Sequence, residues 1–115
     1  MSQEVILIKE EVVVEDGEVI LDIVDIEEYG RKNEKPPRAK RYRIRIDKEY
    51  YEVSVPNMTG RQLLELAGKR PADKWQINEK THGGQVRKIG LHEEADFTRH
   101  GTERFMTLPL DQTEG

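Results

Sequence analysis

The sequence predicts an α+β fold in which a mixed β-sheet packs against one main helix. Two observations carry this prediction for residues 41–109. Apolar residues alternate with polar ones in several short stretches, and one stretch between them has helical spacing and a cap at its start. A third observation, an acidic stretch with β-branched runs, adds an N-terminal extension with strand-forming segments.

The first predicted strands of the sheet form an antiparallel hairpin. Tyr42, Ile44 and Ile46 alternate with three arginines, which places the apolar side chains on one face and the arginines on the other. After a tight turn at residues 47–49, residues 50–55 return with a similar alternation and end at a proline. We expect the arginines to lie on the solvated outer face of an edge strand.

The predicted helix covers residues 60–67 and has complete start signals. Thr59 can cap the first turn while Gln62, three residues later, reaches back to it in a capping box. Gly68 is a natural stop after the last turn. The side chains expected to face the sheet are Leu63, Leu66 and Ala67.

Three further strands complete the predicted sheet, at residues 74–80, 86–89 and 103–108. A turn at His82-Gly83-Gly84 joins the first two, and a long connection from Gly90 to Gly101 contributes Leu91 and Phe97 to the core. The resulting order is hairpin, helix, strand, short strand, crossing loop and closing strand. This is the order of the β-grasp fold, in which the last strand lies parallel beside the first.

The predicted domain organisation has three parts: an acidic extension and linker at 1–40, the β-grasp domain at 41–109 and a flexible tail at 110–115. The first 30 residues hold ten acids and one base, and the remainder holds eighteen bases and thirteen acids, which suggests separate units. Pro36-Pro37 favour an extended linker, and Asp16-Gly17 favours a hairpin before it.

The extension contains β-branched runs that have no evident partner within the β-grasp order. A lone hairpin is marginal in water, so these runs pair within a domain of their own, pair with another copy of the chain, or belong to a disordered acidic arm. The candidate self-association residues are Val5, Ile6, Leu7, Ile8, Val12, Val13 and Val14.

Composition argues against several function classes. The chain has no cysteine, its three histidines lack metal-ligand spacing, and its acids form no pair that catalysis demands, so we expect no catalytic residue, metal or cofactor. There is no signal peptide and no apolar run of about 18 residues, so we expect a soluble cytoplasmic protein without a membrane partner. The basic stretch at 31–45 contains two prolines and no aromatic platform before Tyr42, which argues against nucleic acid.

The last residues run mostly polar out of the closing strand and stop at Gly115. Because glycine lacks a Cβ, it can thread a narrow channel and let an enzyme approach the terminal carboxylate closely. Roughly one chain in fourteen ends in glycine by chance, so the terminus alone decides little.

Residues 42–115 resemble the bacterial ubiquitin-like multiubiquitin domain family. The matching stretches are 41–47, 58–64, 83–85 with 89–91, and 103–115, and residues 25–29 with 35–37 resemble the segment before that domain. The chain departs from the family name in holding one such domain. It departs from ubiquitin in ending with a single glycine after a glutamate, so we expect dedicated partners.

The resemblance implies a protein modifier whose Gly115 carboxylate is adenylated, passed to a cysteine as a thioester and joined to targets, with an isopeptide bond to a target amine. The implied partners are an activating enzyme, a conjugating enzyme and a JAB-type metallopeptidase encoded beside it, together with the target proteins. ATP belongs to the activating enzyme. A bacterial system with a part in defence against phage is also implied.

The tail is expected to lie extended in a partner's groove through Leu110, Asp111, Gln112, Thr113 and Glu114. Of these, Asp111 and Glu114 are expected to discriminate between enzymes by charge. Met106 and Leu108, opposite Phe105, form either a patch for the conjugating enzyme or part of the core. The alternatives to a modifier are a sulfur carrier with a C-terminal thiocarboxylate and a non-covalent module on the same fold.

Overall fold

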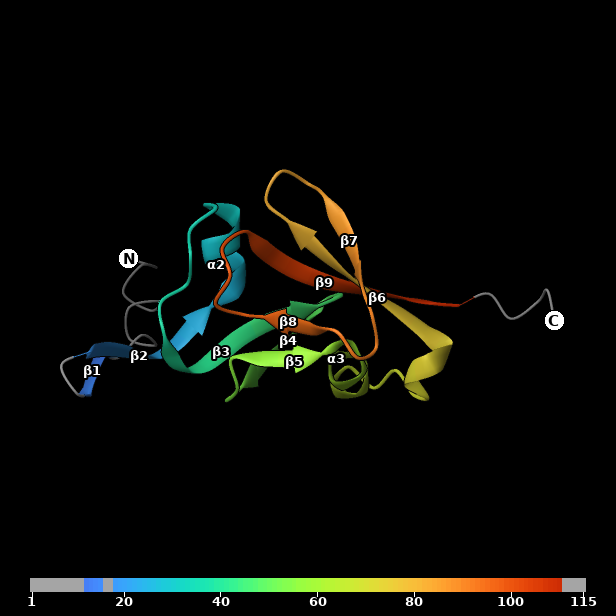
Figure 1. Ribbon diagram of the computed structural model, residues 1–115, viewed down its shortest axis with the longest axis horizontal. Coiled ribbons are helices and arrows are strands. Elements are labelled where there is room, and N and C mark those ends of the chain that lie inside the picture. The colour runs from blue at the N-terminus through green and yellow to red at the C-terminus, as the bar shows by residue number, and fades with distance from the viewer. Residues whose placement is uncertain (1–11, 16–17, 111–115) are drawn as a thin grey trace.

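The computed structural model describes residues 12–15 and 18–110, without the side chains of residues 12–15, 18 and 19. In chain order its elements are β1 (Val12–Glu15), β2 (Glu18–Asp25), α2 (Ile26–Arg31), β3 (Ala39–Ile46), β4 (Glu49–Val53), β5 (Asn57–Thr59), α3 (Gly60–Leu66), the 3-10 turn η1 (Ala72–Lys74), β6 (Trp75–Thr81), β7 (Val86–Ile89), β8 (Glu94–Asp96) and β9 (Thr102–Pro109). Figure 1 shows a sheet that extends along the molecule, with β1 and β2 toward one end and the exit of β9 toward the other.

The predicted β-grasp arrangement is confirmed: the main sheet is mixed and α3 is its main helix. The strand order is β1-β2-β3-β9-β6-β7, and β4 pairs with β3 as well. The first and last strands of the β-grasp part are parallel, with Ile46 of β3 beside Phe105 of β9. β6 is the antiparallel neighbour of β9, and β7 pairs antiparallel with the other edge of β6.

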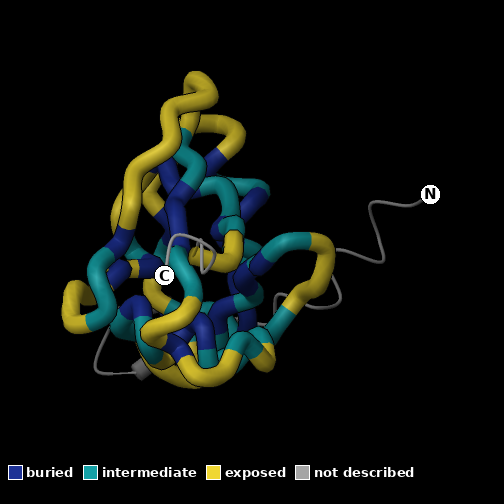
Figure 2. Tube along the Cα trace, turned by 90° about the vertical axis from the view of Figure 1, so that its right-hand side faces the viewer, coloured by how far each residue is buried: buried dark blue, intermediate teal, exposed yellow. Residues whose placement is uncertain are grey.

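The core lies between the sheet and α3. The inward side chains of β3 and β9 belong to one buried cluster with Leu63 and Leu64, and Figure 2 shows buried segments through the interior of the molecule. The ring of Phe97 lies 6.2 Å from the rings of both Tyr42 and Phe105. The prediction that Phe97 belongs to the core is therefore confirmed. Burying a side chain of this size contributes about 1.5–3 kcal/mol to the free energy of unfolding.

The capping box of α3 is confirmed. Gln62 N donates to Thr59 Oγ1 at 3.1 Å, and Thr59 N donates to Gln62 Oε1 at 2.9 Å. Gly68 has a φ of +78°, which a glycine adopts without strain, and it follows the end of the helix. Leu64 is fully buried although the predicted apolar stripe omitted it, because η1 and the sheet cover two sides of this short helix.

The N-terminal segment belongs to the same sheet. β2 pairs in parallel with β3, with Val24 beside Tyr42 and Asp25 beside Arg43. Tyr42 also pairs with Val53 of β4, so β2 and β4 lie along opposite edges of β3. The prediction that this strand is an edge strand is therefore wrong.

The hairpin predicted at Asp16-Gly17 is confirmed by its flanking strands, because Glu15 of β1 pairs with Glu18 of β2. Val12, Val13 and Val14 pair with Leu21, Ile20 and Val19 of β2. The partner of this run is thus the other strand of the predicted hairpin, which joins the β-grasp part through the pairing of β2 with β3, and Val5 to Ile8 lie outside the described residues.

Ion pairs connect the acids of β2 and α2 to the arginines of β3. The pairs are Arg41–Asp22 at 2.6 Å, Arg43–Asp25 at 3.8 Å and Arg45–Glu27 at 3.0 Å. The acidic and basic stretches, whose asymmetry suggests separate units, thus lie side by side and neutralise each other. The Arg41–Asp22 and Arg43–Asp25 pairs are partly exposed, and exposed pairs contribute about 0–1 kcal/mol each, so these two contacts favour the register more than they add stability.

Apolar burial stabilises the N-terminal segment more strongly than its ion pairs. Val24 and Ile26 are fully buried in the core cluster, and Ile20 and Ile23 are almost completely buried. At about 1.5–3 kcal/mol for each side chain, their burial outweighs the ion pairs.

Glu27 is a buried carboxylate on α2, with a side chain only 6% exposed. Its Oε1 accepts from the Tyr50 hydroxyl at 2.9 Å, and its Oε2 accepts from Arg45 at 3.0 Å and lies 3.2 Å from Arg31. Burial alone raises the pKa of Glu27. The hydrogen bonds from Tyr50 and Arg45 and the charge of Arg31 outweigh that effect and hold the pKa below its ordinary value of 4.5.

Gly30 allows α2 to lie directly against the backbone of β9. A Cβ at this position would be 2.0 Å from the Thr102 carbonyl oxygen. The turn between β6 and β7 reaches the same helix, because His82 Nδ1 lies 3.0 Å from the Arg31 carbonyl oxygen.

We predict that Gly30→Ala lowers the free energy of unfolding by about 1–3 kcal/mol, because the added methyl group forces α2 away from β9. Gly90→Ala is the matched control, since a Cβ there meets only ordinary contacts, the nearest at 3.7 Å, and leaves stability unchanged or raised by up to about 1 kcal/mol. Chemical denaturation measures both variants. Equal stabilities would show that α2 does not pack on β9 as described.

We predict that Glu27→Gln lowers the free energy of unfolding at neutral pH by about 1–3 kcal/mol, because the charged acceptor is lost. The native pKa lies below 4.5, so the wild-type advantage is present above that pH and disappears as the pH falls through the native pKa. Denaturation curves from about pH 7 to about pH 3 measure this. Glu34→Gln is the control, because the Glu34 side chain is exposed. A stability difference between Glu27→Gln and wild type that stays constant with pH would contradict the prediction.

Candidate functional site: the closing strand and the base of the tail

β9 carries the chain from the core to the tail. Phe105 is buried, whereas Leu108 is 44% exposed and Leu110 is 37% exposed. Met106 is partly buried, and neither Met106 nor Leu108 belongs to the core cluster. The structure therefore places Leu108 on the surface, which removes the core-packing alternative for this residue.

β6 fixes the last described residues of the chain. Trp75 pairs with Pro109 and Gln76 pairs with Leu108 in the antiparallel register. Leu110 N donates to the Lys74 carbonyl oxygen at 2.9 Å. Leu110, predicted as the first residue of the tail, is thus still bonded to the fold, and Asp111, Gln112, Thr113, Glu114 and Gly115 lie outside the described residues.

Asp47, in the turn between β3 and β4, clamps β9 from the opposite side. Its carboxylate accepts from Thr107 N at 2.9 Å and from Thr107 Oγ1 at 2.6 Å, and its own N–H donates to the Phe105 carbonyl oxygen at 2.9 Å. Its φ is +56°, in the left-handed region that aspartate tolerates better than most residues. The sequence marked Asp47 only as a turn residue, because its partner lies 60 positions later in the chain.

The surface beside Leu108 is mixed rather than purely apolar. Met106 pairs with Asn78 of β6, and the Gln76 amide donates to Asn78 Oδ1 at 3.0 Å. The patch predicted at Met106 and Leu108 is therefore a small apolar strip bordered by amides. A partner that binds it has to offer a small apolar contact with polar groups at its margin.

Two lysines belong to the segment beside the end of β9. Lys69 Nζ lies 4.7 Å from the centre of the Trp75 ring, and Lys74 provides the carbonyl that anchors Leu110. The tail that follows carries Asp111 and Glu114.

Glu79 is a titratable group that connects strands within the fold. Glu79 is almost completely buried and accepts from the Thr102 hydroxyl and from Arg87 at 3.2 Å, which links β6, β7 and β9. In residues 12–15 and 18–110, no group of three or more histidines or acids could hold a metal ion. No helix in these ranges is long and apolar enough to cross a membrane.

Residues 42–109 match the family model described as multiubiquitin. This chain belongs to the multiubiquitin family. The match begins in β3 and ends in β9, so the multiubiquitin domain contains the β-grasp part, and β1, β2 and α2 lie outside it. No match is found among curated proteins or among solved structures. Ubiquitin-like domains of this kind are typically modifiers or modules rather than enzymes.

We predict that Asp47→Ala lowers the free energy of unfolding by about 2–3 kcal/mol and speeds amide exchange at Thr107, because both side-chain bonds to β9 are lost. Asp47→Asn is the matched variant. It tolerates the positive φ and keeps one acceptor oxygen, so we expect a smaller loss. Equal effects of the two substitutions, or unchanged exchange at Thr107, would contradict the clamp.

Proposed function

We propose that this chain is a ubiquitin-like protein modifier whose Gly115 carboxylate is activated and joined to target proteins in the bacterial cytoplasm. One observation carries the proposal: β9 of a multiubiquitin domain leaves the fold at Leu110 and continues into a short acidic segment that ends in glycine. A carboxylate on a segment without a bulky last side chain can enter an active site of another protein.

The proposed chemistry divides the work between this chain and its partners. The Gly115 carboxylate attacks the α-phosphate of ATP in an activating enzyme and releases pyrophosphate. A cysteine thiolate then displaces AMP, and a target amine finally displaces the thiolate. The chain supplies the carboxylate and the docking surfaces, and a conjugating enzyme and a JAB-type peptidase complete the cycle.

Docking in this proposal uses the strip beside the tail. Leu108 and Met106 contact the conjugating enzyme, while Leu110 to Glu114 lie extended in a groove of the activating enzyme. The charges of Asp111 and Glu114 oppose binding to an enzyme whose groove is acidic. Self-association through the N-terminal strands, including Val5 to Ile8, stays a prediction beside this function.

Deleting Gly115 should abolish thioester formation with the cognate activating enzyme in the presence of ATP, because the carboxylate then ends one residue short of the reacting thiolate. A gel shift that is lost on reduction detects the thioester. The deleted residue lies beyond β9 in the sequence, so the denaturation midpoint is the control for folding and should not change. Full activity of the shortened chain would refute the proposal. A terminus in which sulfur has replaced one carboxylate oxygen, seen by mass spectrometry, would favour the sulfur carrier instead.

A further inference from the structure

The outer face of the sheet is the face that points away from the buried side chain of Phe105. On β9 this face carries Arg104, Met106 and Leu108, because side chains alternate along a strand. α2 packs against the first residues of β9, where Gly30 approaches the strand. The open part of the outer face therefore begins at Arg104 and continues to the end of β9.

Arg104 is a cation without a counterion in the described part of the chain. Its side chain is partly buried, and its Nε is completely buried and forms no hydrogen bond. Its guanidinium has no hydrogen bond and no ion pair with any described residue. Its neighbours across the sheet are also cations: Lys80 of β6 and, one position before Ile46, Arg45 of β3. An arginine that packing holds in place without a partner is prepared to bind a carboxylate.

The carboxylates that flank Arg104 on this face are bonded to other cations. Glu103 accepts from Lys80 at 3.3 Å, and Glu27 accepts from Arg45 at 3.0 Å. Lys88 of β7 is exposed and, like Arg104, has no partner among the residues that the structure describes. The outer face therefore has an excess of positive charge.

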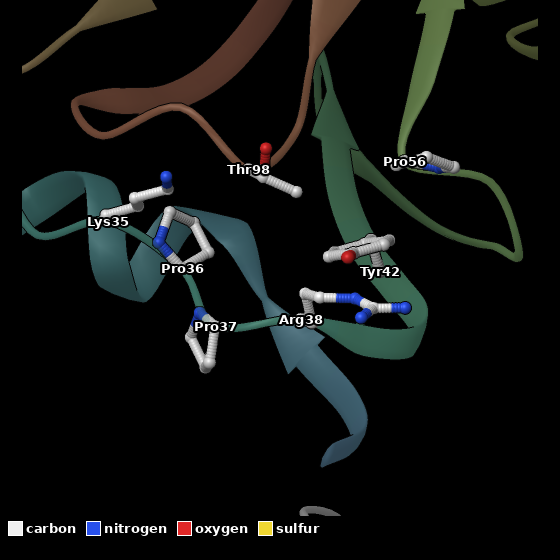
Figure 3. Close-up of a pocket in the computed structure, with 7 residues that line it drawn as sticks. All are labelled: Lys35, Pro36, Pro37, Arg38, Tyr42, Pro56 and Thr98. Carbon is white, nitrogen blue, oxygen red and sulfur yellow. The ribbon is translucent and has the colours of Figure 1, made fainter. Parts of the chain in front are cut away.

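The groove shown in Figure 3 differs from the outer face in this respect. Its volume is about 500 Å³, and its walls include Tyr42 and the linker after α2, with Lys35. Hydrogen bonds from Thr98 lower the pKa of Asp96 beside the groove, and neighbouring positive charges, including that of Lys35, lower it further. Lys35 thus has a carboxylate to act on within the fold.

The backbone of β9 offers no free edge beside the outer-face side chains. β6 pairs with one side of the strand from Thr102 to Pro109, and Asp47 bonds to Phe105 and Thr107 on the other side. A partner strand therefore cannot add to the sheet at this point. Recognition of the outer face has to use side chains, which an α-helix presents in a regular stripe.

The spacing of the outer-face residues suits such a stripe. At about 3.3 Å per residue along β9, Met106 and Leu108 lie about 7 Å and about 13 Å from Arg104. On a helix, the positions four and eight residues from a starting position point to nearly the same side, about 6 Å and about 12 Å along the axis. One helix can therefore contact all three residues.

We propose that the outer face binds an α-helix of a partner protein that directs a carboxylate to Arg104 and two apolar side chains to Met106 and Leu108. The carboxylate neutralises the unpaired guanidinium, and the apolar side chains, four and eight residues away on the helix, cover the exposed strip. The contact rests on the proposed function only in that the helix then belongs to the conjugating enzyme. Binding itself needs neither ATP nor a reactive terminus.

An alanine-based helical peptide with one glutamate and two leucines, each four residues apart on one side, tests the proposal by NMR titration of the full chain. We expect saturable shifts of the Arg104 Nε–H and of the amides of β9 and β6. Arg104→Gln should weaken binding by about fivefold, and Arg104→Lys by less, because lysine keeps the charge but not the bidentate fork. Arg70→Gln is the matched control: this exposed arginine lies beside α3, also has no described partner, and should leave the affinity unchanged when replaced.

A second peptide, with glutamine in place of the glutamate, identifies the group that Arg104 binds. It should bind wild type about fivefold more weakly than the first peptide does, and Arg104→Gln should weaken its binding no further. Absence of saturable binding of the first peptide up to about 1 mM would overturn the proposal, as would equal weakening by Arg104→Gln and Arg70→Gln. Arg104→Gln removes a buried donor without a partner, so its denaturation midpoint, the control for folding, should not fall.

Discussion

Two strands, β2 and β9, pair with the same edge of β3, and the rest of the structure depends on this arrangement. β2 pairs with the first half of this edge, at Tyr42 and Arg43, and β9 pairs with its end, at Ile46. β4 occupies the opposite edge over residues 42–46. Because β2 and β9 follow each other along one line, α2 at the end of β2 meets the beginning of β9, and Gly30 is the residue that allows this contact. The N-terminal segment and the β-grasp part therefore constrain each other.

This arrangement explains the charge distribution better than a division into independent units does. Three acids of β2 and α2 meet three arginines of β3, and two of these pairs are partly exposed, so their energies are small. Glu27 differs because burial removes it from water, and its hydrogen bonds then decide its ionisation. Apolar burial supplies most of the stability of the N-terminal segment, and the ion pairs oppose a shift in the register between β2 and β3.

Local features could be predicted from the sequence and non-local ones could not. The capping box of α3 involves residues three positions apart, and the alternation in β3 marks its buried face without knowledge of any partner. The pairing of β2 with β3 has no local signal, and the charge asymmetry between the two stretches suggested separate units instead. For the candidate site, the sequence alternation around Phe105 left open whether Leu108 faces solvent or the core. The contacts of Asp47 and Lys74 with the end of β9 join residues that are far apart in the sequence, so no local pattern predicts them.

In the proposed function, the anchoring of β9 also limits how a partner enzyme can work on this chain. Asp47 and Lys74 fix the strand on two sides, so Leu108 and Leu110 have defined positions relative to the sheet. Five residues separate Leu110 from the terminal carboxylate and span at most about 18 Å. An enzyme that contacts Leu108 while it acts on Gly115 must therefore place its reacting group within that distance of the end of β9. In the proposed function, the fold thus sets the docking geometry, and the chemistry of the last five residues sets which groove accepts them.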